Sequence, residues 1–182
     1  MPVEEQMLRY AAPTLAGCKV ANLMSVPCGL CQQKDFAYCQ NCLACSGISI
    51  HLLSDHDDRR LLYIYRRSAL LKLLSDPEIQ SFLRDFSYKD FSIAACLGLL
   101  TKHVGEEKPF PHEIGIFLGY PLKDVSGFIA NKGKNAKLTG YWKVYDNEEE
   151  AVRTFALYAD CRRDLWEKFR QGFSFRELSV VG

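Results

Sequence analysis

The sequence predicts a single-domain α+β fold over residues 1–182, with a small sheet of three or four strands, covering helices and a long C-terminal helix. Three observations lead to this prediction. Two short segments rich in apolar and aromatic residues, 48–53 and 60–66, flank a polar turn. Apolar residues recur at helical spacing over 68–104, and another long helical pattern follows Asn147. Short strands segregated from runs of helices are typical of α+β domains.

In the first third of the chain, local signals set the expected elements. A helix is predicted over 3–11, and Pro13 should stop it because proline cannot continue a helix. A strand follows at 19–26 and a short helix at 35–45. The polar turn between the two later strands is placed at 54–58.

The middle of the chain is expected to be helical. The apolar pattern over 68–104 is broken at Asp76-Pro77 and again near Tyr88, because proline and loss of periodicity both interrupt helices. Two or three helices should therefore form, the last over 90–103.

Turn and cap residues mark the last elements. Pro121 suits the first turn of a helix that runs to Lys132, and Gly133 suits the left-handed position that ends it. Residues 141–145 alternate as a strand should, with Trp142 and Val144 on the buried face. Asn147 can cap the long last helix, which should reach about residue 171.

Composition limits the possible functions. The 182 residues are 48% hydrophobic, enough for one continuous core. The net charge of +1 gives no global attraction to nucleic acid or to an anionic membrane. The N-terminal residues are acidic rather than signal-like, and no apolar run approaches the length of a membrane span, so we expect a cytoplasmic protein with no membrane contact. In that compartment thiols stay reduced, which favours metal binding, redox chemistry or burial for the eight cysteines.

A cysteine-rich segment at 28–45 is the leading candidate for a site. Cys28 with Cys31, and Cys39 with Cys42, form two pairs of the spacing that binds zinc through four thiolates. Cys39, Cys42 and Cys45 also repeat the start of an iron–sulfur ligand run, with Cys28 or Cys31 available as the fourth ligand. The segment therefore predicts zinc or an iron–sulfur cluster.

Two alternatives for this segment remain open. Cys39, Cys42 and Cys45 are three residues apart on a predicted helix, so they can form a buried apolar stripe, because free cysteine is often fully buried. A redox dithiol at Cys28 and Cys31, or at Cys39 and Cys42, is the other alternative.

A second candidate is the block at 109–145, whose apolar and glycine spacing fits a helix-turn-helix within a winged-helix-like unit over 112–145. The basic stretch after Lys132 could then track phosphates as a wing. However, the would-be recognition helix carries only Lys123, offset by Asp124, and no arginine. Nucleic-acid binding is therefore possible but not favoured over plain packing of two helices. The positions that fit the motif are Ile114, Gly115, Leu118, Gly119, Val125 and Phe128.

A third interpretation is a cysteine-dependent enzyme whose candidate catalytic groups are His112, Glu113, Cys96, Cys161 and Lys19. Such an enzyme needs a thiolate beside a histidine base. Cys96 lies in an apolar helix pattern, where a buried thiol is the simpler interpretation. The arginines that follow Cys161 would lower the pKa of its thiol if it were exposed.

Two further candidates concern ligand binding. Lys19 begins a predicted strand, where a lone lysine is usually exposed, although a ligand-binding role is possible. The face of strand 141–145 that carries Tyr141, Lys143 and Tyr145 could stack a base or a flavin-like ring, with core packing as the alternative.

Three motifs carry a resemblance to a known family: PTLAGCK at 13–19, FPHEIGIFLGYPLKDVSGFI at 110–129 and GYWKVY at 140–145. With the Tyr65-Arg66 pair, they resemble an uncharacterised bacterial family of about this length, found mostly in anaerobes. The resemblance covers nearly the whole chain and implies no established activity. Because the five-cysteine cluster is not part of that family's pattern, a metal site there would be an addition in this member.

Overall fold

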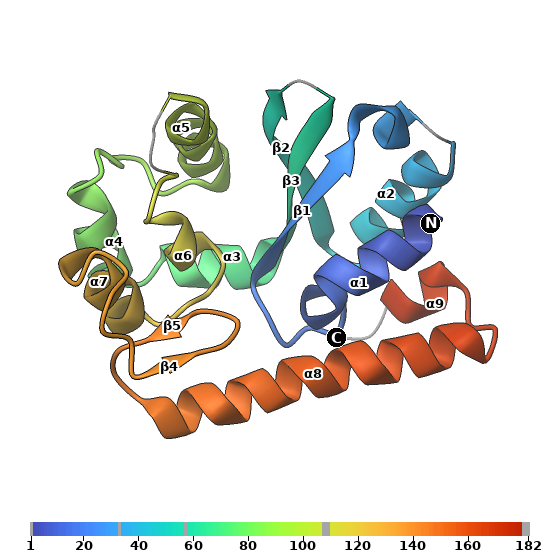
Figure 1. The fold of residues 1–182 in the computed structure, drawn as a ribbon. Helices are drawn as coiled ribbons and strands as arrows, with labels where there is room; N and C mark the ends of the chain where they lie inside the picture. Colours follow the sequence, from blue (N-terminus) through green and yellow to red (C-terminus); the bar gives the residue numbers. More distant parts are fainter. Residues whose placement is uncertain (1, 33, 57, 107–109, 180–182) are drawn as a thin grey trace.

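The structure, a computed structural model, describes residues 2–32, 34–56, 58–106 and 110–179 (Figure 1). It is α+β, as predicted, with a three-stranded sheet and a separate two-stranded one. The strands are β1 Ala21–Pro27, β2 Ile48–His56, β3 Arg59–Arg66, β4 Leu138–Thr139 and β5 Lys143–Val144. The helices are α1 Val3–Leu15, α2 Lys34–Cys45, α3 Arg67–Leu74, α4 Pro77–Arg84, α5 Ile93–Glu106, α6 Ile114–Phe117, α7 Leu122–Ala130, α8 Glu148–Arg170 and α9 Phe175–Ser179, with a 3-10 turn, η1, at Cys28–Gln32.

The central sheet is antiparallel, in the order β1-β3-β2. Both of its faces are covered, because the side chains of β3 alternate between two clusters. Leu62 and Ile64 pack with α1 and α2, whereas Tyr63 and Tyr65 pack with the helices from α3 to α6. Because both faces of the sheet are buried, polar and apolar residues do not alternate along the centre of β3. Figure 1 shows the sheet between these two groups of helices.

The expected stop at Pro13 is wrong, because α1 continues to Leu15 with Pro13 inside its last turn. The proline removes one hydrogen bond to the carbonyl of Arg9, but the helix ends only two residues later, so a single missing bond does not stop it earlier. Arg66 from the end of β3 then closes the helix. Its Nε donates to the carbonyl of Thr14 at 2.7 Å and its Nη2 to that of Leu15 at 2.5 Å.

The end of β2 also differs from the prediction. The strand β2 continues through Ser54, Asp55 and His56, so the expected turn at 54–58 is shorter; Asp57 lies outside the described residues. The register shift between Leu52 and Ser54 inserts one extra residue and keeps the longer strand paired with β3.

The predicted end signals of the last helices are confirmed. Gly133 has a φ of +71°, and its amide donates to the carbonyl of Phe128 at 2.8 Å after α7 ends. Asn147 caps α8, because its side chain accepts a hydrogen bond from the Glu150 amide at 3.1 Å. The expected strand at 141–145 is shorter, since only Lys143 and Val144 pair with β4.

The long helix α8 connects the two ends of the molecule. Its C-terminal half contributes Leu165 to the cluster of α1 and α2, and its N-terminal half contributes Ala151 and Tyr158 to a third cluster around the β4–β5 hairpin. Figure 1 shows α8 running beneath both groups of helices. Among the described helices, none has the length and apolar character needed to cross a membrane.

Candidate functional site

A cavity of about 530 Å³ lies between α6, α7 and the β4–β5 hairpin. Most of its wall is apolar or aromatic, and all of its described lining falls within residues 110–143. The volume is within the range of sites that hold small molecules. The lining includes Phe110, His112, Tyr120, Phe128, Trp142 and Lys143.

Asp124 of α7 fixes the hairpin that forms one wall of the cavity. Its Oδ1 accepts hydrogen bonds from the amides of Tyr145 at 2.8 Å and Asp146 at 3.0 Å. Its Oδ2 accepts a bond of 2.7 Å from the indole Nε1 of Trp142. The carboxylate is buried, and three donors compensate its charge. Asp124 therefore acts as a structural anchor for the Trp142 ring.

The Trp142 ring forms an aromatic wall with Tyr120. The two rings are stacked, with centroids 5.1 Å apart and planes 28° apart. On α8, Phe155 meets the Trp142 ring edge-on at 4.6 Å. The Tyr120 hydroxyl donates to the Tyr141 carbonyl at 3.2 Å. The wall is thus held by both α8 and the hairpin before any ligand binds.

Two exposed polar side chains of the lining, Lys143 and His112, form the rim of the cavity. Lys143 is exposed, its Nζ donates to the Gly133 carbonyl at 2.7 Å, and it lies 5.8 Å from the centroid of the Phe128 ring. His112 is also exposed, and its ring meets Phe128 edge-on at 5.1 Å. Because Lys143 uses one of its three N–H groups, the others are available to an acceptor on a ligand.

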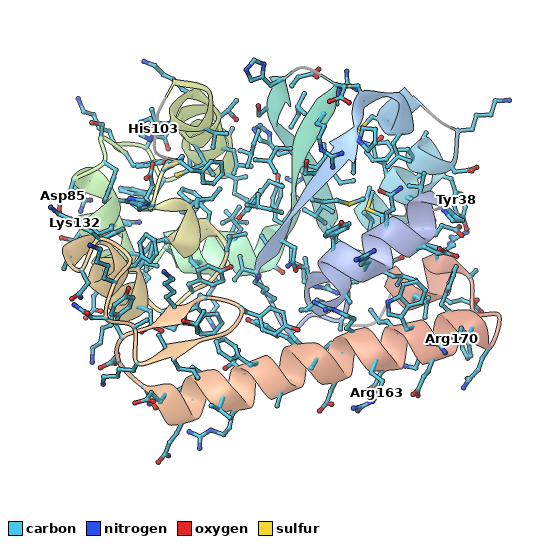
Figure 2. The ribbon with its side chains drawn as sticks, viewed as in Figure 1. Tyr38, Asp85, His103, Lys132, Arg163 and Arg170 are labelled. Atoms are coloured by element: carbon cyan, nitrogen blue, oxygen red, sulfur yellow. The ribbon has the colours of Figure 1, made fainter. Side chains whose placement is uncertain are left out.

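His112 and Glu113, consecutive in sequence, point to different environments. Glu113 is buried, and its Oε1 lies 2.6 Å from His103 Nδ1 and accepts a long bond of 3.4 Å from the Tyr88 hydroxyl. Its Oε2 has no partner among the described residues. Figure 2 labels His103 on α5. Glu113 therefore ties α6 to α5, whereas His112 faces the cavity.

Lys19 is buried, so the expectation that it is exposed is wrong. Its Nζ lies 5.2 Å from the ring centroid of Tyr120 and 5.6 Å from that of Tyr158. Burial lowers the pKa of Lys19 to about 8. The lysine is not part of the cavity lining, but it supports Tyr120 from outside the cavity.

The two single cysteines proposed as nucleophiles are buried, and burial raises the pKa of Cys96 to about 11 and that of Cys161 to about 12. The arginines beside Cys161 do not reverse this effect, because the thiol points into the protein. Its sulfur lies 2.9 Å from that of Cys18, a residue that the sequence patterns did not single out. No sequence signal joins two cysteines 143 positions apart.

The cysteine-rich segment is spread over η1 and α2. Cys39 and Cys42 are buried against the core, whereas Cys45 is exposed. Cys28 and Cys31 are half-buried, and the Cys28 thiol donates to Asp55 at 3.4 Å. Within the described ranges, no three or more histidine, cysteine or acidic side chains are grouped to hold a metal ion. Zinc or iron–sulfur binding by this segment stays a prediction.

The helix-turn-helix interpretation concerns the same block as the cavity. Gly119 occupies the turn with a φ of +76°, but α6 has only four residues. Lys137 is held by the Asp146 carbonyl at 2.9 Å, and Lys132 lies at the outer surface beside α7 (Figure 2). Phe128, taken from the sequence as a core position of the second helix, lines the cavity instead. Nucleic-acid binding stays a prediction.

No curated protein and no solved structure matches the chain. The sequence profile of the family described as "Protein of unknown function (DUF3793)" matches residues 7–179. The matched span includes the three sequence motifs and the whole described lining of the cavity. The chain therefore belongs to this family, in agreement with the resemblance to an uncharacterised family that its motifs carry.

Proposed function

We propose that the protein binds a small planar aromatic molecule with an acidic group in the cavity between α6, α7 and the β4–β5 hairpin. The observation that carries this proposal is the preformed cavity of about 530 Å³ with an aromatic wall and a cationic rim. Tyr120, Trp142 and Phe128 offer ring surfaces, and aromatic groups stack or meet edge-on at such surfaces.

The charge of the ligand follows from the two ionic side chains in the lining. The Asp124 oxygens are held by three donors from the hairpin, so this carboxylate is engaged in the wall of the cavity and is not the group that orients a ligand. Lys143 retains free N–H groups at the rim. An acidic group on the ligand would therefore meet Lys143, while its ring occupies the apolar interior.

Two fluorescent probes test the proposal: anilinonaphthalene sulfonate, which is aromatic and anionic, and phenylnaphthylamine, which is aromatic and neutral. Both should bind with enhanced emission. Lys143→Gln should weaken sulfonate binding about fivefold and leave phenylnaphthylamine binding unchanged, because only the sulfonate uses the charge. Thr139→Trp places a large ring at the cavity wall and should abolish binding of both probes.

Lys137→Gln is the matched control for Lys143→Gln. Both lysines belong to the hairpin region, both are exposed and both donate to a backbone carbonyl, but Lys137 does not line the cavity. The control should bind both probes as the wild type does. Unchanged binding of both probes by Thr139→Trp would place them elsewhere and exclude the cavity as the site.

A further inference from the structure

Cys18 and Cys161 are brought together by the fold from opposite ends of the sequence. Cys18 lies in the connection between α1 and β1, and Cys161 lies near the middle of α8. The Cys161 thiol donates to the Cys18 sulfur at 2.9 Å. Among the described cysteines, this is the only pair of sulfurs in hydrogen-bonding contact.

The surrounding structure holds both sulfurs in place. The amides of Cys18 and Lys19 both donate to the Pro13 carbonyl, at 2.9 and 3.1 Å, which fixes the connection against the end of α1. Gly17 permits the sharp turn there with a φ of +79°. On the other side, Cys161 is part of a continuous helix. A disulfide needs the sulfurs about 2 Å apart, so closure requires a movement of about 1 Å.

We infer that Cys18 and Cys161 form a reversible disulfide bond that joins the α1–β1 connection to α8. The oxidant is a low-molecular-weight disulfide of the glutathione class. Cys18 is the more exposed of the two, so it reacts first. Its thiolate attacks one sulfur of the small disulfide, a mixed disulfide forms, and one small thiolate leaves.

The second step completes the exchange. Cys161 loses its proton to solvent and attacks the Cys18 sulfur of the mixed disulfide, which expels the second small thiolate. Two protein thiols are thereby oxidised, and one small disulfide is reduced to two thiols. A thiol reductant reverses both steps. Burial raises the pKa of Cys161, so this step should be the slower one.

The bond would close a loop between residues 143 positions apart and restrain the unfolded chain over most of its length. It would also hold α8 in place between the part that packs in the hairpin cluster and the part that packs in the cluster of α1 and α2. The consequence is a stability difference between the reduced and oxidised protein.

The full-length protein is equilibrated with oxidised and reduced glutathione, alkylated, and digested without reduction for mass spectrometry. The expected result is a peptide pair joined through Cys18 and Cys161, with a rise of about 5–10 °C in the thermal midpoint. Recovery of both cysteines as alkylated thiols, or pairing only within the 28–45 segment, would overturn the inference.

Three alanine variants separate this bond from general oxidation. Cys96→Ala removes another buried cysteine and should keep the rise in thermal midpoint. Cys18→Ala and Cys161→Ala should each lose it. If one of the latter two does not fold, the other and the peptide map of the wild type still decide the question. A full rise in either variant contradicts the proposed pair.

Discussion

At the scale of single residues, Lys19 is an ammonium group buried beside two tyrosine rings. Burial lowers its pKa from 10.5 to about 8, because desolvation disfavours the charged form. The unfolded chain therefore binds more protons than the folded chain between about pH 8 and pH 10.5. The destabilisation caused by the buried Lys19 is therefore greatest below about pH 8, and it disappears as the pH rises from about 8 to 10.5.

Lys19→Met tests this penalty, since methionine keeps much of the apolar stem without the charge. We expect the variant to be more stable than the wild type by about 1–2 kcal/mol at neutral pH, because cation–π contacts offset part of the desolvation cost. The gap should close toward pH 10. Urea unfolding of the wild type and the variant, from neutral pH to about pH 10, measures the difference in their free energies of unfolding. A less stable variant at neutral pH would mean that the ammonium stabilises the fold.

At the scale of elements, the attachment of the hairpin to α7 depends on one carboxylate. Asp124→Ala removes the acceptor for the Trp142 indole and for two backbone amides, so three donors lose their hydrogen-bond partner. We expect a loss of about 3–4 kcal/mol in the free energy of unfolding. The urea midpoint, measured with probe binding to the cavity, reports both stability and the integrity of the site.

Asp146→Ala is the comparison for this variant. The Asp146 carboxylate makes an exposed ion pair with Lys123 at 3.2 Å, and its own amide still reaches Asp124 after the substitution. Exposed pairs contribute little, so the expected loss is below about 1 kcal/mol. Equal losses in the two variants would contradict the anchoring role of Asp124.

The cysteine-rich segment leads to a prediction about η1 and α2. Because Cys39 and Cys42 face the core, a four-thiolate site requires these two elements to rearrange around the ion. Metal and acid-labile sulfide content of protein purified without oxygen measures this directly. Zinc without colour indicates the four-cysteine site, iron with sulfide indicates a cluster, and a metal-free protein contradicts both.

Cys45→Ser separates the two metals. The predicted zinc ligands are Cys28, Cys31, Cys39 and Cys42, so this variant should keep its zinc. The iron–sulfur run includes Cys45, so cluster content should fall. Because Cys45 is exposed, the substitution should not disturb the core.

The sequence predicted the class of fold and most elements because their signals are local. Asn147 and Gly133 mark helix ends through their own backbone chemistry, and both predictions hold. The prediction at Pro13 was wrong because the last turn of α1 is held by Arg66, which lies about 50 residues away in sequence. Lys19 misled because burial is decided by Tyr120 and Tyr158, which are far away in sequence.

The candidate site was only partly predictable for the same reason. The block at 109–145 stood out, and Trp142 with Val144 was correctly assigned to the buried face of its strand. The cavity itself depends on how α7 packs against the hairpin through Asp124, which no spacing rule encodes. The contact of Cys18 with Cys161 likewise exists only after α8 has docked.

At the scale of the whole molecule, the three hydrophobic clusters share elements. Strand β3 serves both clusters of the central sheet, and α8 joins the hairpin cluster to that of α1 and α2. Loss of one cluster therefore removes packing from the next. We expect one cooperative unfolding transition, as for a single domain.

The two tryptophans report on opposite ends of this arrangement, since Trp142 belongs to the hairpin cluster and Trp166 packs against the cluster of α1 and α2. Trp142→Phe and Trp166→Phe each leave one tryptophan, whose emission can be excited selectively over that of the tyrosines. Trp142→Phe also removes a donor to Asp124, so midpoints are compared within each variant and not between them. In both, the fluorescence midpoint in urea should coincide with that of far-UV circular dichroism. If the Trp142 signal changes at lower urea than the helical signal, the hairpin and the cavity unfold as a separate unit, and α8 does not couple the two ends.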